Sequence, residues 1–263
     1  MNFLQISQNI PEVEPEIIFS IGGFPVTNSM MLVWLIIPLF MVFSYLLKKR
    51  LCLAPDKKTQ LISEIIVEKT FALLDQVTRN REKTKKIFPI AGSIFIFFLI
   101  SNIIILIPGP GALTIGEKSL FRTPTTDLNT TLAVAVLILI LAQLFSIRSK
   151  GTLEHFGQYF QFKQVFKGFK QGLSQGAFSI INFVMGLLDI VGDFAKTISL
   201  SFRLFGNMFA GEVLMIVVMS FFAFVAPSLI VAQTLLIGVL QAVVFAILSA
   251  VYLSLAVDTP NSS

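Results

Sequence analysis

The chain has 263 residues, of which 55% are hydrophobic and 13% are charged, whereas about 25% of the residues of an average soluble protein are charged. This composition excludes a disordered chain and argues against a soluble domain. The 20 Lys and Arg residues and 15 Asp and Glu residues give a formal net charge of +5. The positions of these charges decide whether they indicate an acidic partner or membrane topology.

Three windows of the sequence contain no Asp, Glu, Lys or Arg and are about as long as a helix that crosses a bilayer. They cover residues 30–47, 87–107 and 128–147. A stretch without proline follows over 177–226, and a last apolar helix is predicted over 228–257. We therefore expect an all-α polytopic membrane protein with three clear transmembrane helices and two long membrane-embedded helices that form a hairpin over 177–258.

The predicted helix over 177–226 is too long for an upright span. At 1.5 Å per residue, its 50 residues would extend about 75 Å, more than twice the thickness of a bilayer core. The helix must therefore break, with Gly206 and Gly211 as candidate bending points, or lie steeply tilted in the membrane.

The basic residues cluster in two of the connecting segments. Eleven lie within 48–86 and five within 148–170, whereas none precedes residue 30 and only two lie within 108–127. The positive-inside rule makes 48–86 and 148–176 cytoplasmic loops, places the N-terminal segment 1–29 outside, and leaves the C-terminus cytoplasmic. The net charge therefore indicates topology, and no nucleic-acid partner is expected.

Residues 56–79 carry apolar side chains at helical spacing and predict an amphipathic helix on the cytoplasmic side. Two interpretations stay open for this helix: a connector that packs on its own subunit, or a docking surface for a partner. The single cysteine, Cys52, and the single histidine, His155, lack companions for a metal site. We expect no metal, no cofactor and one integral membrane domain over residues 1–263.

Residues 124–127 read as a turn followed by a helix cap, with Asp127 or Asn129 opening the third span. Two roles are open for Asp127. Its carboxylate can cap the helix, or it can line an aqueous entrance.

Five polar side chains of the long helix fall within about 40° of one line at 100° per residue. They are Asp189, Asp193, Lys196, Arg203 and Asn207, whereas Glu212 lies on a different face. A structural interpretation pairs Asp193 with Lys196 and lets Arg203 reach the membrane interface. In the functional interpretation, Arg203 keeps its proton, promotes proton release from a carboxylate and blocks a hydrated proton, while acids such as Asp189 and Glu212 load and unload protons.

The last helix carries a weak polar stripe on which Thr234 and Tyr252 fall within about 20° of Gln241. A buried glutamine needs a hydrogen-bond partner. Antiparallel packing of the two long helices would bring Gln241 near Arg203.

The segment 199–212, Ser-Leu-Ser-Phe-Arg-Leu-Phe-Gly-Asn-Met-Phe-Ala-Gly-Glu, resembles subunit a of the rotary F-type ATP synthase. Residues 106–109, 124–132, 240–242 and 251–253 resemble other segments of the same family, so that the resemblance extends from about Met30 to Asp258. It implies a stator subunit of the membrane sector that holds two tilted helices against a rotating ring of c subunits.

The resemblance also implies roles for single residues. Arg203 matches the arginine that releases the proton from each passing c-subunit carboxylate, and Gln241 matches the glutamine that faces it. Asn207 and Glu212 match residues of the outer half-channel, and Asp189 matches an acid of the inner one. Thr234 departs from the pattern, because some family members have an ionisable group at this position.

The function expected from this resemblance is proton conduction through two offset half-channels, which drives rotation coupled to ATP synthesis, with no nucleotide site in this chain. The expected partners are the c-subunit ring, the peripheral-stalk b subunits, the remainder of the complex and the lipid of a bacterial plasma (inner) membrane. The alternatives are a stand-alone proton channel, a secondary transporter, or a scaffold without an ion path.

Overall fold

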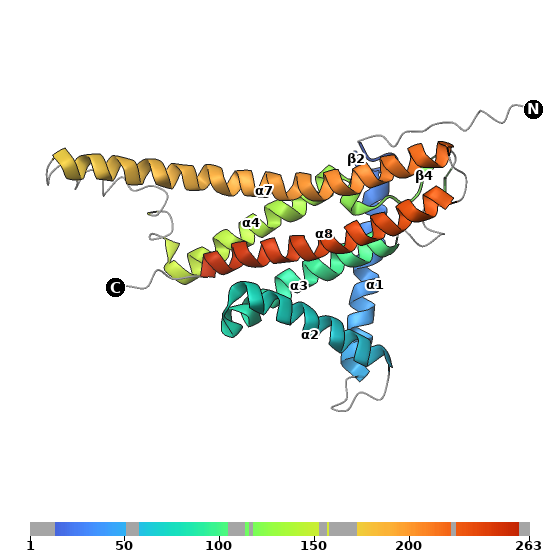
Figure 1. Cartoon of the computed structure of the whole chain (residues 1–263), viewed down its shortest axis with the longest axis horizontal. Helices are drawn as coiled ribbons and strands as arrows, with labels where there is room; N and C mark the ends of the chain where they lie inside the picture. Colours follow the sequence, from blue (N-terminus) through green and yellow to red (C-terminus); the bar gives the residue numbers. More distant parts are fainter. Residues whose placement is uncertain are drawn as a thin grey trace, which may run out of the picture. The chain divides into compact units, whose positions relative to one another are not determined.

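The computed structural model describes residues 14–50, 58–104, 114–115, 118–152, 157, 173–221 and 225–257. Six helices make up most of this part (Figure 1): α1 (Asn28–Arg50), α2 (Lys58–Thr78), α3 (Arg81–Ile104), α4 (Leu128–Lys150), α7 (Leu173–Phe221) and α8 (Val225–Val257). Cys52, His155 and residues 106–109 of the resemblance lie outside the described residues. The expected all-α architecture is confirmed.

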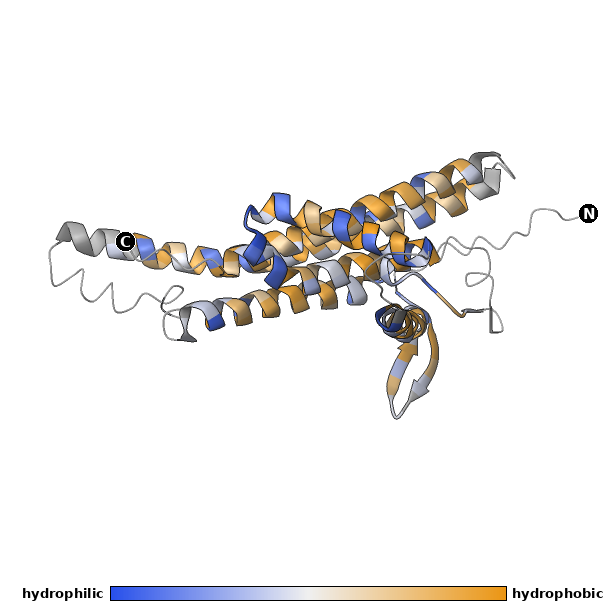
Figure 2. Ribbon diagram, turned by 90° about the horizontal axis from the view of Figure 1, so that it is seen from below, coloured by the Kyte–Doolittle hydropathy of each residue, from blue (hydrophilic) through white to orange (hydrophobic). Residues whose placement is uncertain are grey.

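Five of these six helices, all except α2, are long and apolar enough to cross a membrane. Figure 2 shows that hydrophobic residues predominate along them. Only 11–39% of each apolar window is buried within the chain, and large side chains such as Trp34 and Met41 of α1 are exposed. Such surfaces suit lipid tails rather than water, so the polytopic membrane protein predicted from the charge-free windows is confirmed.

The long helix predicted over 177–226 is one helix, α7, which continues without interruption through both Gly206 and Gly211. Of the two possibilities for its excess length, the structure excludes a break within 173–221. Helix α8 begins at Val225, slightly earlier than predicted, with Pro227 in its first turn. Proline is tolerated there because the first N–H groups of a helix have no intrahelical partner.

Two short antiparallel hairpins were not predicted. Strand β1 (Ile17–Ile21) pairs with β2 (Phe24–Thr27), and β3 (Thr114–Ile115) pairs with β4 (Lys118–Ser119). The turn of the first hairpin is Gly22-Gly23, with φ values of 57° and 90°. Positive φ at both central residues is what a tight two-residue hairpin requires, and glycine adopts it without steric cost.

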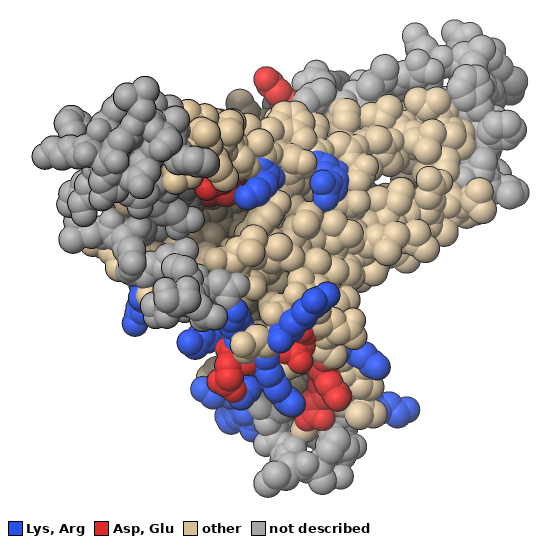
Figure 3. All heavy atoms as spheres, turned by 60° about the vertical axis from the view of Figure 1, so that its left-hand side comes forward, with Lys and Arg blue, Asp and Glu red and all other residues tan. Residues whose placement is uncertain are grey.

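Helix α2 packs on its own chain through α3. The rings of Phe71 and Phe88 meet edge to face with centroids 5.3 Å apart, and Thr84 donates a hydrogen bond of 2.8 Å to the Asp75 carboxylate. The opposite face of α2 exposes apolar side chains such as Ile62. Charged side chains gather over α2 and the adjoining ends of α1 and α3 (Figure 3). The predicted amphipathic helix is confirmed, as is its packing on its own subunit.

The chain divides into two compact units, and three helices contribute to both. Unit 1 comprises Met1–Thr131 and Phe202–Ala250, and unit 2 comprises Leu132–Ser201 and Val251–Ser263. In unit 1, Phe98 of α3 and Phe245 of α8 are buried with ring centroids 4.6 Å apart. In unit 2, the Ser149 hydroxyl at the end of α4 donates a 3.2 Å hydrogen bond to the Val257 carbonyl at the end of α8.

A buried asparagine ties together three elements of unit 1, namely α3, α8 and the short helix η2 (Pro124–Thr126). Asn102 donates to the Gly238 carbonyl at 2.9 Å and accepts from the Thr125 hydroxyl at 2.7 Å. A Cβ at Gly238 would lie 3.0 Å from the Asn102 Cβ. Glycine at this position therefore allows α8 to approach α3 closely enough for the hydrogen bond.

Candidate functional site

Arg203 lies on an exposed face of α7 in unit 1. Phe202, Gly206, Asn207 and Ala210 are also exposed, and their spacing of three and four residues places them on the same side of the helix. Leu204 and Met208 face the opposite way and are buried. In the described part of the chain, no hydrogen bond or ion pair involves the Arg203 side chain. The structure therefore presents a permanent cation outward.

Gly206 lies one helical turn after Arg203 and is not required by the packing within the chain. A Cβ built at Gly206 would meet no atom within 4 Å. A helical glycine costs about 0.5–1 kcal/mol relative to alanine, and no contact among the described residues offsets that cost. A small residue beside an outward cation leaves space for the close approach of another molecule.

The proximity of Gln241 to Arg203 stays a prediction. Gln241 is half-buried on α8, and within the described residues it shares no hydrogen bond with Arg203. Both residues belong to unit 1.

Glu212 of α7 pairs with a residue that the sequence did not single out. Arg122, just before η2, is buried with 8% of its side chain exposed, and its Nη2 lies 3.7 Å from Oε2 of Glu212. In the sequence, Arg122 stood out only as one of the two basic residues within 108–127. Its burial depends on contacts with residues far away in the sequence, so no local pattern predicted it. One local signal was available: Arg122 lies two residues before Pro124, at the start of the turn that the sequence predicts over 124–127.

Thr234, which departs from the family pattern, lies where α8 packs closely against α7. Gly211 of α7 packs against α8 at Thr234, because a Cβ at Gly211 would lie 3.3 Å from the Thr234 hydroxyl oxygen. The hairpin of α7 and α8 is therefore tightly closed directly beside Glu212. Thr234 supplies a hydroxyl there, which can donate and accept hydrogen bonds.

Asp127 caps α4, as one of its two predicted roles requires. Its Oδ1 accepts the Asn129 backbone N–H at 2.9 Å, and its Oδ2 accepts the hydroxyls of Thr130 and Ser29. These are the contacts of an N-cap, with Ser29 of α1 as an added partner that the sequence did not indicate. Asp127 is buried, with 3% exposed.

Unit 2 contains a cavity of about 230 Å³ between α4, the first part of α7 and the end of α8. Its polar lining residues are Gln143, Ser146, Asp189, Asp193, Lys196, Thr197 and Tyr252. A cavity of this size with several polar partners has room for a few water molecules. The predicted residues Asp189 and Asp193 are thus brought together at one site.

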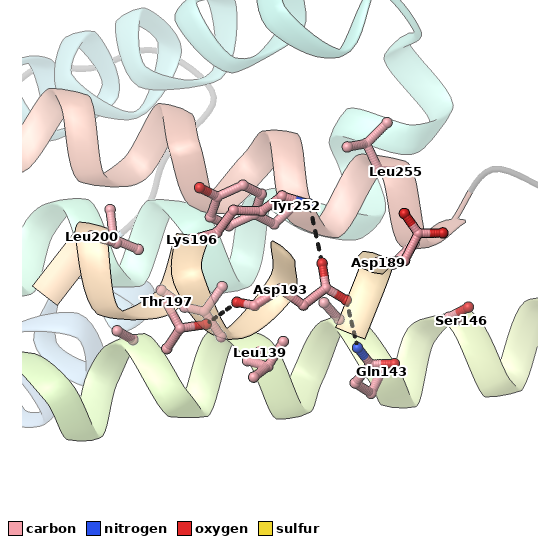
Figure 4. A pocket seen from close by; sticks show the side chains of 14 residues that line it. Leu139, Gln143, Ser146, Asp189, Asp193, Lys196, Thr197, Leu200, Tyr252 and Leu255 are labelled. Atoms are coloured by element: carbon pink, nitrogen blue, oxygen red, sulfur yellow. Dashed lines mark hydrogen bonds and ion pairs between the residues drawn. The ribbon is translucent and has the colours of Figure 1, made fainter. Parts of the chain in front are cut away.

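Asp193 is the centre of the polar contacts in this cavity (Figure 4). Lys196 donates to its Oδ1 at 3.1 Å, and Gln143 of α4 donates to its Oδ2 at 3.2 Å. The pairing of Asp193 with Lys196, which the structural interpretation predicted, is therefore formed. The Lys196 ammonium also lies 6.0 Å from the ring centroid of Tyr252. Gln143 was not predicted, because a single amide in an apolar helix gives no recognisable pattern.

Comparison with known proteins decides the family. The family model described as ATP synthase A chain matches residues 28–254, which is most of the chain and contains Arg203, Asn207, Glu212 and Gln241. The chain is a member of this family. Among its relatives, the sodium ion specific ATP synthase subunit a of Propionigenium modestum is 34% identical over 90% of this chain and 76% of that protein. Subunit a of Moorella thermoacetica is 28% identical over 92% of this chain and 96% of that protein.

Membership of the subunit a family confirms the resemblance carried by residues 199–212. The chain is an integral membrane subunit of the stator of the multisubunit F-type ATP synthase, and it takes part in ion transport and ATP synthesis. The family match and the five apolar helices agree on a membrane location.

Proposed function

We propose that this subunit a conducts protons through two offset half-channels to and from the carboxylates of a c-subunit ring. The resulting rotation is coupled to ATP synthesis. The observation that carries the proposal is the outward Arg203 on a helix face of small and apolar residues. A guanidinium at membrane depth is costly unless it meets a protein group or water. The ring carboxylates would be the partners that the described residues do not provide.

Arg203 would act on each ring carboxylate as a fixed positive charge. It attracts the ionised form of a carboxylate and so favours release of the bound proton. It stays charged at every physiological pH, so it does not carry the proton itself. The open space at Gly206 supports this proposal, because a ring helix could approach α7 closely one turn from Arg203.

The two half-channels would use different groups of residues. We assign Glu212, Asn207, Gln241 and Thr234 to the outer path, with Asp127 at the start of α4 as a structural support. The cavity at Asp189 and Asp193 would be the inner path, because its polar lining can hold water. A proton could then pass from one path to the other only when it is carried by the rotating ring.

The charge pattern supports a topology for this function. The 11 basic residues within 48–86 would place α2 on the cytoplasmic side of a bacterial plasma membrane, with the N-terminus outside and the C-terminus inside. The whole chain would form one membrane domain. Its partners would be the c-ring, the peripheral-stalk b subunits and the rest of the complex.

The experiment replaces Arg203 in the assembled ATP synthase and measures ATP-driven proton pumping in proteoliposomes. Arg203→Ala should abolish pumping while the complex still assembles, because no hydrogen bond or ion pair among the described residues involves this side chain. Lys85→Ala is the control, because Lys85 is an exposed cation whose ion pair within the described residues is with the exposed Glu82. Normal coupled pumping by the Arg203 variant would contradict the proposal. If pumping by the unsubstituted complex requires Na⁺, the coupling ion is Na⁺ and the assignment to protons is wrong.

The stand-alone channel is tested with this chain alone in liposomes. We expect no sustained proton flux without the ring, because the two paths are offset. Steady flux through the isolated chain would favour the channel and contradict the half-channel proposal.

The sidedness of the two paths is tested with isosteric variants. Glu212→Gln should slow proton uptake from the outer side more than Asp189→Asn does, and Asp189→Asn should slow uptake from the inner side more. Equal slowing on both sides by each variant would contradict the assignment of the faces.

A further inference from the structure

Arg122 is a buried cation that the proposed half-channels leave without a role. Only 8% of its side chain is exposed, and it lies in unit 1 beside Glu212. Burying a guanidinium costs several kcal/mol unless it is paired and hydrogen-bonded. A protein that keeps such a group inside a membrane unit gains something specific from its charge.

The position of the guanidinium is set by groups other than Glu212. Arg122 donates from Nη1 to the Glu14 carbonyl at 3.1 Å and from Nε to the Thr126 hydroxyl at 3.3 Å. Its backbone N–H reaches the Asn28 carbonyl at 3.4 Å. The side chain is therefore held in place before it meets Glu212, which is the condition for positioning another group.

The pair of Arg122 and Glu212 is close but not a hydrogen bond. Nη2 and Oε2 lie 3.7 Å apart, and neither atom has a hydrogen-bond partner in the described part of the chain although both are buried. At this distance the attraction between the charges is strong in a poorly solvated site, yet the carboxylate stays free to accept a proton or a water molecule at Oε2.

Other charged groups of unit 1 do not supply this attraction. Asp127 has both carboxylate oxygens occupied as the cap of α4. Helix α8 contributes no Asp, Glu, Lys, Arg or His between Val225 and Ala250. Glu14 meets Arg122 through its backbone carbonyl. Within the described residues of unit 1, Arg122 is therefore the cation that faces Glu212.

We propose that Arg122 is a positioning residue of the outer proton path, which holds the Glu212 carboxylate in place through the attraction between their charges. The step is a proton transfer from outer water to Glu212 and on toward the ring, in which Arg122 keeps all its protons. This inference rests on the proposed function, because it requires Glu212 to lie on a proton path.

The test uses the membrane sector with its c-ring in proteoliposomes and measures initial proton uptake from each side separately. Arg122→Gln should slow uptake from the outer side about tenfold, as expected when a charge-assisted contact is lost, and leave uptake from the inner side within about twofold. Arg122→Lys keeps the charge and should recover the outer rate to within about threefold. Lys85→Gln is the matched control, since it makes the same change at an exposed pair.

A double-mutant cycle separates positioning from a purely structural role. If Arg122 acts through Glu212, Arg122→Gln should change the outer rate by less than about twofold in a Glu212→Gln background. Additive effects would overturn the inference. Equal slowing from both sides, in proportion to the amount of assembled complex, would also overturn it, because that is the result of a fold defect.

The same preparation distinguishes failure of this inference from failure of the proposed function. If Arg203→Ala abolishes conduction but Arg122→Gln acts equally on both sides, the half-channel proposal stands and the role of Arg122 is wrong. If Arg203→Ala leaves conduction intact, the proposed function fails and the inference fails with it.

Discussion

Two acid–base pairs of this subunit have similar chemistry and differ in their surroundings. In unit 1, the Glu212 carboxylate is 31% exposed and lies 3.7 Å from Arg122. In unit 2, the Asp193 carboxylate is 28% exposed and lies 3.1 Å from Lys196. The acids are equally accessible, but the exposed fraction of the cation is 8% for Arg122 and 50% for Lys196.

The burial of the cation determines what each acid does. Lys196 can be hydrated when it separates from Asp193, so their pair contributes about 0–1 kcal/mol. Arg122 has no such route, and loss of Glu212 would leave a buried, uncompensated charge. The pair in unit 1 therefore cannot separate without leaving a buried charge, whereas the cation of the pair in unit 2 is half exposed.

The largest expected difference comes from the same substitution at both acids. Glu212→Leu should destabilise the subunit by about 3–5 kcal/mol, because Arg122 stays buried without a partner, whereas Asp193→Leu should cost about 1 kcal/mol. The midpoint of thermal disassembly of the purified complex measures both effects. The variant Arg122→Leu/Glu212→Leu removes both charges and should regain most of the lost stability. Equal costs at Glu212 and Asp193 would contradict the comparison.

A smaller effect is expected at the exposed cation. Lys196→Met should change stability by less than about 1 kcal/mol, because the ammonium is half exposed and its stem can still cover the ring of Tyr252. In the unsubstituted protein, the free energy that the pair of Asp193 and Lys196 contributes to stability should fall when salt is raised from about 0.05 to about 0.5 M, because salt screens exposed charges. A loss as large as that of Glu212→Leu would show that Lys196 is desolvated in the complex. Thermal disassembly at two salt concentrations gives the measurement.

The spans could be predicted from the sequence because every residue of a span must be compatible with the apolar core of the bilayer. A charge-free window of bilayer length has few alternatives to a helix, and residues 30–47 and 128–147 indeed lie inside α1 and α4. The break considered for the long helix did not occur, because neither Gly206 nor Gly211 removes a backbone hydrogen bond, and helical glycines cost only about 1 kcal/mol each.

The sites were harder to predict because their partners come from distant segments. The stripe of α7 identified Asp189, Asp193 and Arg203. Its partners Arg122 and Gln143, and the Asp127 partner Ser29, come from other segments and carry no periodic signal. The hairpin at Gly22-Gly23 did have a local signal, since two glycines separate two apolar runs. Contacts across more than 80 residues, such as that between Arg122 and Glu212, depend on the packed fold.

The smallest effects are expected at two glycines that directly neighbour the two acids. Gly192 precedes Asp193 and would place a Cβ in open space, whereas a Cβ at Gly211 would lie 3.3 Å from the Thr234 hydroxyl. Gly192→Ala should stabilise the subunit by about 0.5–1 kcal/mol, because alanine loses less backbone entropy in a helix. Gly211→Ala should give no gain, since the same benefit is offset by crowding at Thr234.

Removal of the crowding side chain tests the reason for this difference. In a Thr234→Ala background the Cβ at residue 211 meets no hydroxyl, so Gly211→Ala should then stabilise about as much as Gly192→Ala does. Thermal disassembly of the four complexes measures the coupling between the two positions. If Gly211→Ala is as stabilising with Thr234 present as without it, α7 and α8 are not tightly packed beside Glu212, and the fixed geometry of the pair with Arg122 loses its support.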